Sequence, residues 1–372
     1  MLTSSSSITL IRPRAIEFGP GSVSKVGEWM AGRFQRILVV ADAFNSKRVD
    51  LLGLSGKVTI FAEVRPEPDI PNLEALLAVA EAADPDLVIG FGGGSAMDLA
   101  KLAAVLPGSG CRITDVVGVE RVPAKQAALV QVPTTSGTGS EAGTRALVTD
   151  PVTKNKLAVQ SSHMLADLAV IDPELTLTLP AQVTAATGVD AMAHCVEAFT
   201  SRRAHVSIDM YAIEGVRLVG KYLKRAVVDG SDMEARSGLS LASLYGGYCL
   251  GPVNTTSGHA VAYPLGTRHH IAHGAANALI FPHTLAFNAP AVPEKTAEIL
   301  SALNAPWHTS VFDAAYDFCH GLGCEMKLSQ FAVPRSDLPA MADEAHAIRR
   351  LLDNNPRDMS RDDILTIYEA AY

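Results

Sequence analysis

The hydrophobic pattern of this 372-residue chain changes near Pro180. Before that point, short runs rich in Val, Ile and Leu alternate with helix-like segments, as in RILVVA (36–41) and NLEALLAVAEAAD (72–84). After it, apolar residues recur every three or four positions and strand-like runs almost disappear. Alternating strands and helices are typical of a parallel α/β sheet, whereas sustained helical periodicity predicts packed helices. We therefore predict an α/β domain over residues 1–180 and an all-helical domain over residues 181–372.

Other segments complete the predicted elements. In the first domain, strands are expected within VTIFAEV (58–64), DLVIGFGGG (86–94), AALVQVPTTSGTGSE (127–141) and LADLAVIDPELTLTLP (165–180), with a helix over residues 95–106. In the second domain, long helices are expected in QVTAATGVDAMAHCVEAFTS, SIDMYAIEGVRLVGKYLKRAVV and MEARSGLSLASLYGGYCL.

Charge and cysteine usage exclude several classes of protein. The net charge is −8 and there is no Lys/Arg block, which argues against nucleic-acid binding. No apolar run is long enough to span a bilayer, and the N-terminus lacks the basic and apolar regions of a secretory signal. The five cysteines form no CxxC pair, which argues against a disulfide framework or a zinc–thiolate site. We therefore expect a cytoplasmic protein without membrane or nucleic-acid partners.

The sequence Gly92-Gly93-Gly94-Ser95 lies between a predicted strand and a predicted helix. Glycines allow close approach of a ligand, and the N–H groups at a helix N-terminus suit a pyrophosphate. The pattern is neither GxGxxG nor a P-loop, so a tight turn without a ligand is an open alternative. Asp42 ends the first strand, where a carboxylate binds ribose hydroxyls and disfavours a 2′-phosphate, favouring NAD(H) over NADP(H).

A polar loop, TTSGTGS at residues 134–140, follows another predicted strand. Ligands of open parallel sheets bind at the carboxyl ends of the strands, so this loop is a second candidate for cofactor contact. A serine/threonine turn or a helix cap ahead of Glu141 explains the same residues without a ligand.

Two separated residue pairs are candidate metal ligands. Asp190 and His194 are four residues apart, which on a helix places both side chains on one face. His259 and His273 are fourteen residues apart, about 21 Å along a straight helix. The Pro264-Leu265-Gly266 sequence between them predicts a break that lets the chain fold back. One carboxylate and three imidazoles around a divalent ion make a Lewis-acid site.

Structural explanations of these residues remain open at this point. The Asp190–His194 pair is also compatible with a helix salt bridge, and a lone histidine is usually structural. His269, His270 and His273 crowd one short segment, and helical spacing does not choose among them. Cys195, beside His194, is interpreted as a small buried thiol rather than a ligand.

Taken together, several segments resemble the iron-containing (group III) alcohol dehydrogenases. The resemblance runs over essentially the whole chain, in the right order. FGPGSVSKVGE (18–28) resembles that family's opening hairpin and helix, GGGSAMDLAK (92–101) its pyrophosphate motif and PTTSGTGSE (133–141) its nicotinamide-side loop. DLAVIDPELTLTLP (167–180) resembles its crossing into the helical domain, and GVDAMAHCVEA and GHAVAYPLG…HGAANALIFPH its two metal motifs.

The resemblance implies an NAD(P)-dependent oxidoreductase that transfers hydride between the nicotinamide and a small alcohol or aldehyde. It implies a cleft between a dinucleotide-binding domain and a metal-binding domain, one divalent ion, Fe(II) or Zn(II), and a homodimer or larger homo-oligomer. The implied metal ligands are Asp190, His194, His259 and His273. The implied cofactor contacts are Gly93, Gly94, Ser95 and Asp98 at the pyrophosphate, Thr134, Thr135 and Thr138 along the cofactor, Lys156 near its ribose, and Asp42 in the choice between NAD and NADP.

The chain departs from the family pattern beside the metal motif. The family usually has His-Pro-Leu-Gly where this chain has Tyr263-Pro264-Leu265-Gly266. An unperturbed tyrosine has a pKa of about 10, against about 6.5 for histidine, so the proton path differs from that of common members. Tyr263, His269 and His270 are the candidate catalytic proton donors, alongside water and the ribose hydroxyl. Glu67 stands where the family usually has Asn.

The Tyr-Pro sequence resembles hydroxyacid–oxoacid transhydrogenases and reductases of small anionic aldehydes, such as phosphonoacetaldehyde or a semialdehyde. Arg268, His269 and His270 would favour an anionic substrate if they face the cleft, and a solvated turn is the alternative. Other proteins of similar architecture are the metal-free maleylacetate reductases, the glycerol dehydrogenases and the lyase 3-dehydroquinate synthase. A non-catalytic nucleotide-binding protein would leave the ligand set without a purpose.

Overall fold

The computed structural model describes residues 7–305 and 310–372, and the chain forms two compact units. One unit, here called the sheet unit, comprises Ile11–Thr135 and Gly139–Leu177. The other, the helical unit, comprises Ser136–Thr138 and Thr178–Tyr372, together with the described residues that precede Ile11. The polar loop at 134–140 is therefore divided between the two units.

The sheet unit is built on six parallel strands in the order β1-β9-β6-β4-β2-β3. Four of these strands, β2, β4, β6 and β9, lie within the predicted strand segments, and β3 begins one residue before the segment at 58–64. The bounds are β1 (Ala15–Phe18), β2 (Arg36–Ala41), β3 (Lys57–Phe61), β4 (Leu87–Gly92), β6 (Ala128–Pro133) and β9 (Leu168–Ile171).

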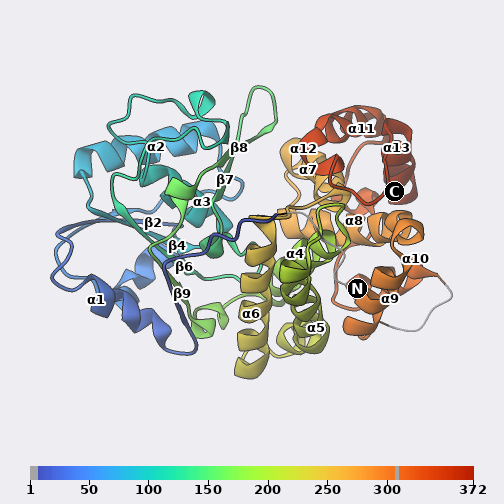
Figure 1. The fold of residues 1–372 in the computed structure, drawn as a ribbon, viewed down its shortest axis with the longest axis horizontal. Helices are drawn as coiled ribbons and strands as arrows, with labels where there is room; N and C mark the ends of the chain where they lie inside the picture. The colour runs from blue at the N-terminus through green and yellow to red at the C-terminus, as the bar shows by residue number, and fades with distance from the viewer. Residues whose placement is uncertain (1–6, 306–309) are drawn as a thin grey trace. The chain divides into compact units, whose positions relative to one another are not determined.

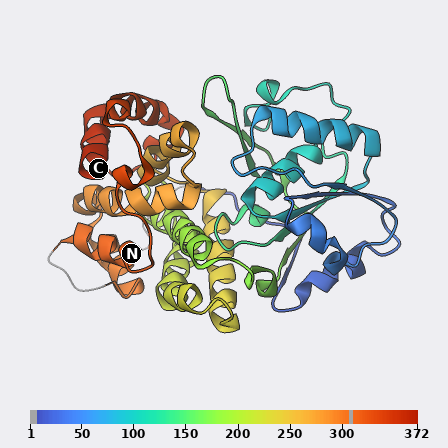
Figure 2. The same cartoon turned by 180° about the vertical axis from the view of Figure 1, so that it is seen from behind.

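Both faces of this sheet are covered, as the continuous apolar composition of its strands requires. Leu38 and Val40 of β2 pack with the apolar side chains of α2 (Ile70–Ala83) and α3 (Gly94–Ala103). Ile37 and Val39 point to the other face and pack against α1 (Lys25–Met30). Figures 1 and 2 show α2 and α3 on one side of the strands and α1 on the other.

A second, three-stranded sheet contains β5 (Gly118–Val119), β8 (Lys156–Gln160) and β7 (Arg145–Thr149), with β7 and β8 antiparallel. Sequence analysis missed these strands, which are two to five residues long. The expected opening hairpin is wrong, because β1 pairs in parallel with β9 across the chain.

The helical unit confirms the predicted long helices as α4, α5 and α6. Val189, Met192 and Val196 of α4 are buried with apolar residues of α5 and α6 in one core, which also contains Cys195. No helix in the described part of the chain is both long and apolar enough to cross a bilayer. The bounds are α4 (Ala181–Thr200), α5 (Val206–Val228), α6 (Met233–Leu250), α7 (Ser257–His269), α8 (His273–Asn288), α9 (Pro293–Ala302), α10 (Val311–His320), α11 (Leu338–Ala347), α12 (Arg349–Leu352) and α13 (Arg361–Ala370).

The turn between α7 and α8 lies later than predicted. Pro264 is inside α7, and the helix continues through it to His269. The chain reverses at His270, which adopts left-handed backbone angles with φ of 56°. The N–H groups of His270 and Ile271 satisfy helix-end carbonyls. The predicted break at Pro264–Gly266 is therefore wrong, although the chain does fold back between His259 and His273.

A close approach of helices beside His273 generates a stability prediction. A Cβ at Gly274 would lie 2.2 Å from the Ala186 carbonyl oxygen, whereas a Cβ at Gly266 meets nothing closer than 3.5 Å. Gly274→Ala must push α8 away from α4, and we expect a loss of about 1–3 kcal/mol of unfolding free energy. Gly266→Ala should be neutral or stabilising by up to about 1 kcal/mol. Urea unfolding of both variants checks the contrast, and equal stabilities would contradict it.

Candidate active site

Three helices bring the four candidate ligands together. Asp190 and His194 come from α4, His259 from α7 and His273 from α8, and one ligand atom from each lies within 4.8 Å of the others. The Asp190 Oδ1 atom is 3.8, 3.6 and 3.5 Å from the Nε2 atoms of His194, His259 and His273. Four ligands at bonds of ~2.1 Å around a tetrahedral ion are ~3.4 Å apart. The spacing therefore fits a single divalent ion.

Burial and charge favour the metal-binding protonation state of Asp190 and His194 but not that of His259. Burial and the neighbouring histidines lower the pKa of His194 to about 4, although Asp190 opposes the shift. Burial alone would raise the pKa of Asp190, but the three histidines outweigh it and lower that pKa. Burial also opposes protonation of His259, but Glu197 and Asp190 raise its pKa to about 10. Metal binding requires the carboxylate deprotonated and the imidazoles neutral, so binding an ion must release the His259 proton.

Two further polar residues contact the ligands, and sequence analysis missed both. Glu197 accepts a hydrogen bond from Nδ1 of His259 at 2.5 Å. Asn277 donates its side-chain amide to Asp190 Oδ1 at 2.7 Å. Glu197 follows Asp190 by two helical turns, and Asn277 follows His273 by one. A search for polar residues on the same helix faces as the ligands would have found them.

Of the candidate proton donors, Tyr263 packs against the ligands. Its ring centroid lies 6.3 Å from that of His259 and 5.8 Å from that of His273. His269 and His270 lie at the end of α7. His269 Nε2 is 3.4 Å from Asp337 Oδ2, and His270 is the exposed cap of that helix.

The expected cationic cluster is largely neutralised by carboxylates. Arg268 makes a forked ion pair with Glu344 of α11, with Nε to oxygen distances of 2.9 and 2.8 Å. Arg350, which sequence analysis did not identify as a candidate, lies beside Tyr263. The exposed Arg350 has its guanidinium carbon 5.7 Å from the Tyr263 ring centroid. Among the described carboxylates none is within ion-pair distance of it, whereas its neighbour Arg349 pairs with Asp353.

In the sheet unit, the glycine turn joins β4 to α3 as predicted. A Cβ at Gly92 would lie 2.9 Å from Ala96 Cβ, and one at Gly93 would lie 3.5 Å from Thr135 Oγ1. Helix α3 begins at Gly94, and its first backbone bonds run from the N–H groups of Ala96 and Met97 to the Gly93 carbonyl, so the N–H groups of Gly94 and Ser95 have no helical partner. This close-packed turn fits the glycine requirement of a phosphate cradle.

Asp42 lies beside this turn. Its carboxylate accepts hydrogen bonds from the backbone N–H of Phe44 and Asn45 and from the Asn45 side chain. Asn45 also donates to the Thr134 hydroxyl at 3.2 Å. Hydrogen bonds from Phe44 and Asn45 therefore fix the Asp42 carboxylate, and Asn45 connects it to Thr134 in the polar loop after β6.

Asp98 and the buried Lys101 of α3 form a polar network. Asp98 accepts hydrogen bonds from the Ser140 hydroxyl and the Leu147 N–H, and Lys101 donates to Ser140 and to the Arg145 carbonyl. Burial lowers the pKa of Lys101, and Asp98 opposes that shift. The side chain that the resemblance implied for the pyrophosphate thus binds α3 to the loop after β6 and to β7.

Lys156, expected near the cofactor ribose, forms an ion pair with Glu67. Its side chain is 8% exposed, and that of Glu67 is 35% exposed. The unusual glutamate at this position therefore has a local charge partner. Thr135 belongs to the sheet unit with Thr134, whereas Thr138 belongs to the helical unit.

Comparison with known proteins agrees with both units. The family model described as iron-containing alcohol dehydrogenase matches residues 13–173, and that described as the C-terminal part of the Fe-containing alcohol dehydrogenase family matches residues 184–372. The chain belongs to the iron-containing alcohol dehydrogenase family. This places it among oxidoreductases that act on CH–OH groups.

Individual relatives cover nearly the whole chain. Long-chain-alcohol dehydrogenase 1 of Geobacillus thermodenitrificans is 36% identical over 91% of this chain and 90% of its own length. Sulfoacetaldehyde reductase of Bilophila wadsworthia is 37% identical over 84% of each. The structure of sulfoacetaldehyde reductase from Bifidobacterium kashiwanohense in complex with NAD+ matches with a TM-score of 0.88 and 27% identity, over 99% of both chains.

Proposed function

We propose that this chain is a metal-dependent, NAD(P)-linked alcohol dehydrogenase or aldehyde reductase that acts on a small substrate. The observation that carries the proposal is the convergence of Asp190, His194, His259 and His273 from three helices at ion-binding distances. A divalent ion bound there, Fe(II) or Zn(II), supplies Lewis-acid polarisation of a carbonyl or hydroxyl oxygen. A nicotinamide supplies or accepts the hydride.

The residues of the sheet unit support the cofactor half of the proposal. Gly92, Gly93 and the first turn of α3 provide backbone donors for a pyrophosphate. Asp42 presents a carboxylate at the end of β2, which would bind ribose hydroxyls and repel a 2′-phosphate. We therefore favour NAD(H) over NADP(H), in line with the NAD+ complex of a relative.

Tyr263 is the group that we assign to proton transfer. It is buried, 6% exposed, and packs against two of the proposed ligands. In aldehyde reduction its hydroxyl would donate a proton to the substrate oxygen as negative charge develops there. In alcohol oxidation the same phenol oxygen would receive the proton.

A substrate with an anionic tail is the second element of the proposal, and Arg350 supports it. The guanidinium lies over Tyr263 and is not neutralised by a described carboxylate, whereas Arg268 is paired with Glu344. A planar guanidinium binds sulfonate, phosphonate and carboxylate groups through forked hydrogen bonds. A relative named as a sulfoacetaldehyde reductase agrees with an aldehyde of this kind.

Removal of a ligand tests metal dependence. We expect His259→Ala and His273→Ala to lose bound metal and turnover together, because each removes one of four ligands. His283→Ala is the matched control, since His283 also lies on α8 but is absent from the ligand set. Elemental analysis and NAD(H)-linked assays of folded, reconstituted protein give the measurement. Full activity of metal-stripped enzyme would contradict the proposal.

Tyr263→Phe tests proton transfer. We expect kcat for aldehyde reduction to fall by about 10²–10⁴-fold, with metal content unchanged. Tyr368→Phe is the control, because Tyr368 donates to the Val261 carbonyl inside the unit and serves packing. It should lower stability by about 1 kcal/mol without lowering kcat. Wild-type kcat in Tyr263→Phe would assign proton transfer to His269, His270, water or the ribose hydroxyl.

Arg350→Ala tests recognition of the anion. The ratio of kcat/KM for sulfoacetaldehyde to that for propanal should fall about tenfold or more, the value of a charged hydrogen bond. Arg349→Ala removes the adjacent arginine, whose charge Asp353 already balances, and should leave the ratio unchanged. Equal ratios in wild type and Arg350→Ala would rule out this assignment.

A further inference from the structure

The Glu197 carboxylate joins the two helices that carry most of the ligand set. It comes from α4, which also provides Asp190 and His194, and reaches the beginning of α7, which provides His259. One carboxylate oxygen accepts from Nδ1 of His259. The other accepts from the backbone N–H of Thr256 at 2.6 Å, the Thr256 hydroxyl at 3.0 Å and the backbone N–H of His259 at 3.3 Å. The negative charge therefore also stabilises the N-terminus of α7.

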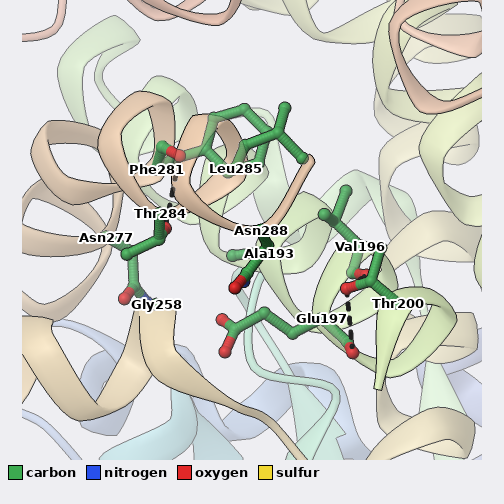
Figure 3. Close-up of a pocket in the computed structure, with 10 residues that line it drawn as sticks. All are labelled: Ala193, Val196, Glu197, Thr200, Gly258, Asn277, Phe281, Thr284, Leu285 and Asn288. Atoms are coloured by element: carbon green, nitrogen blue, oxygen red, sulfur yellow. Dashed lines mark hydrogen bonds between the residues drawn. The ribbon is translucent and has the colours of Figure 1, made fainter. Parts of the chain in front are cut away.

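The neighbouring glycine permits this contact. A Cβ at Gly258 would lie 2.7 Å from Glu197 Oε1 and 3.0 Å from its carboxyl carbon. Figure 3 shows the Glu197 side chain extending from its helix toward Gly258. The residue before the third ligand thus has no side chain because a carboxylate occupies the space that a side chain would need.

The cavity beside Glu197 is too small for a substrate. Glu197, Gly258 and Asn277 line it, and its volume of about 20 Å³ holds about one water molecule. Ligand pockets are typically 300–1,000 Å³. The polar contacts of the Glu197 carboxylate are therefore with Thr256 and His259 and not with a substrate in this cavity.

We propose that Glu197 is the positioning residue of the metal site, one that fixes the ligand set before an ion binds. The inference rests on the metal dependence proposed above. Because Nδ1 of His259 donates to Glu197, the lone pair of the neutral ring is on Nε2, the atom that lies 3.6 Å from Asp190 Oδ1. The same carboxylate fixes the start of α7, so it sets both the tautomer and the position of the third ligand.

His259 in turn orients His194. The two imidazole rings are stacked, with centroids 4.7 Å apart and an interplanar angle of 21°. His194 Nδ1 is buried and has no hydrogen-bond partner in the described part of the chain. Its ring therefore contacts His259 by stacking and Asp190 through Nε2, and a change at Glu197 that moves His259 would affect two ligands.

Asn277 gives corresponding support to the carboxylate ligand. Its amide nitrogen donates to Asp190 Oδ1 and lies 3.3 Å from the Nε2 atoms of both His259 and His273. Asn277 is on α8, so the contact ties the carboxylate of α4 to the helix of the fourth ligand. Glu197 thus links α4 to the ligand on α7, and Asn277 links α8 to the ligand Asp190 on α4.

Metal affinity is the readout that distinguishes positioning from packing. We would measure the Kd and dissociation half-time of Zn(II) by competition with a chromophoric chelator, and record the visible spectrum of the Co(II) form. Glu197→Gln and Glu197→Ala should weaken Zn(II) binding about 10- to 100-fold, the usual effect of losing an outer partner, with Ala more severe than Gln. The Co(II) spectrum should change with coordination geometry.

Gly258→Ala is an independent variant that keeps every polar group. Alanine favours the helix more than glycine does, which offsets part of the lost contact between Glu197 and the start of α7, so the metal-free protein should stay folded. The added Cβ displaces the Glu197 carboxylate, and we expect Zn(II) binding to weaken about tenfold. If Glu197 served only the stability of the fold, Zn(II) affinity would fall together with the unfolding free energy. If it positions the ligands, Zn(II) affinity falls while the metal-free protein stays folded.

Thr200→Val is the matched control. Thr200 lines the same cavity on the same helix, and its hydroxyl donates to the Val196 carbonyl within that helix. Zn(II) affinity should stay within twofold of wild type. Wild-type Zn(II) affinity in Glu197→Gln and Gly258→Ala would overturn the positioning role of Glu197 and leave the proposed function standing. A wild-type protein that binds none of Zn(II), Co(II) and Fe(II) would overturn the proposed function, and the inference with it.

Discussion

The burial of a negative charge is the constraint around which the helical unit is arranged. Asp190 is 3% exposed, and an unpaired carboxylate at such a position costs several kcal/mol. Three imidazoles and the Asn277 amide surround it, and they come from α4, α7 and α8. The reversal between α7 and α8, the close packing of α8 on α4 and the capping of α7 by Glu197 all bring partners to this group. The arrangement that satisfies the buried charge also fits a divalent ion.

Much of the architecture could be predicted because it depends on local patterns. The strands with continuous apolar runs and the helices with a clear period were found, and so was the i,i+4 relation of Asp190 and His194. The convergence of His259 and His273 was also expected, but the turn was placed at Pro264. The helix tolerates that proline, and the reversal occurs at His270, a non-glycine residue in a left-handed conformation that carries no signal in the sequence.

The parts that could not be predicted depend on contacts between residues far apart in the chain. Glu197 meets Thr256 and His259 only after α4 and α7 pack. The charge of Arg268 is balanced by Glu344, 76 positions later, so its place beside two histidines suggested a cationic cluster that the fold neutralises. Arg350 lies over Tyr263 across a similar separation. Glu67, which stands where the family usually has Asn, likewise forms an ion pair with Lys156, 89 positions later.

The glycines beside two of the ligands affect how related sequences should be compared. Gly258 precedes His259 and leaves room for a carboxylate, and Gly274 follows His273 and leaves room for the Ala186 carbonyl. A homologue could retain all four ligands and still lose the geometry through a single methyl group at either position. Ligand identity alone is therefore an incomplete criterion for transferring metal dependence across such sequences. The residues at 197, 258 and 274 need to be inspected together with the ligands.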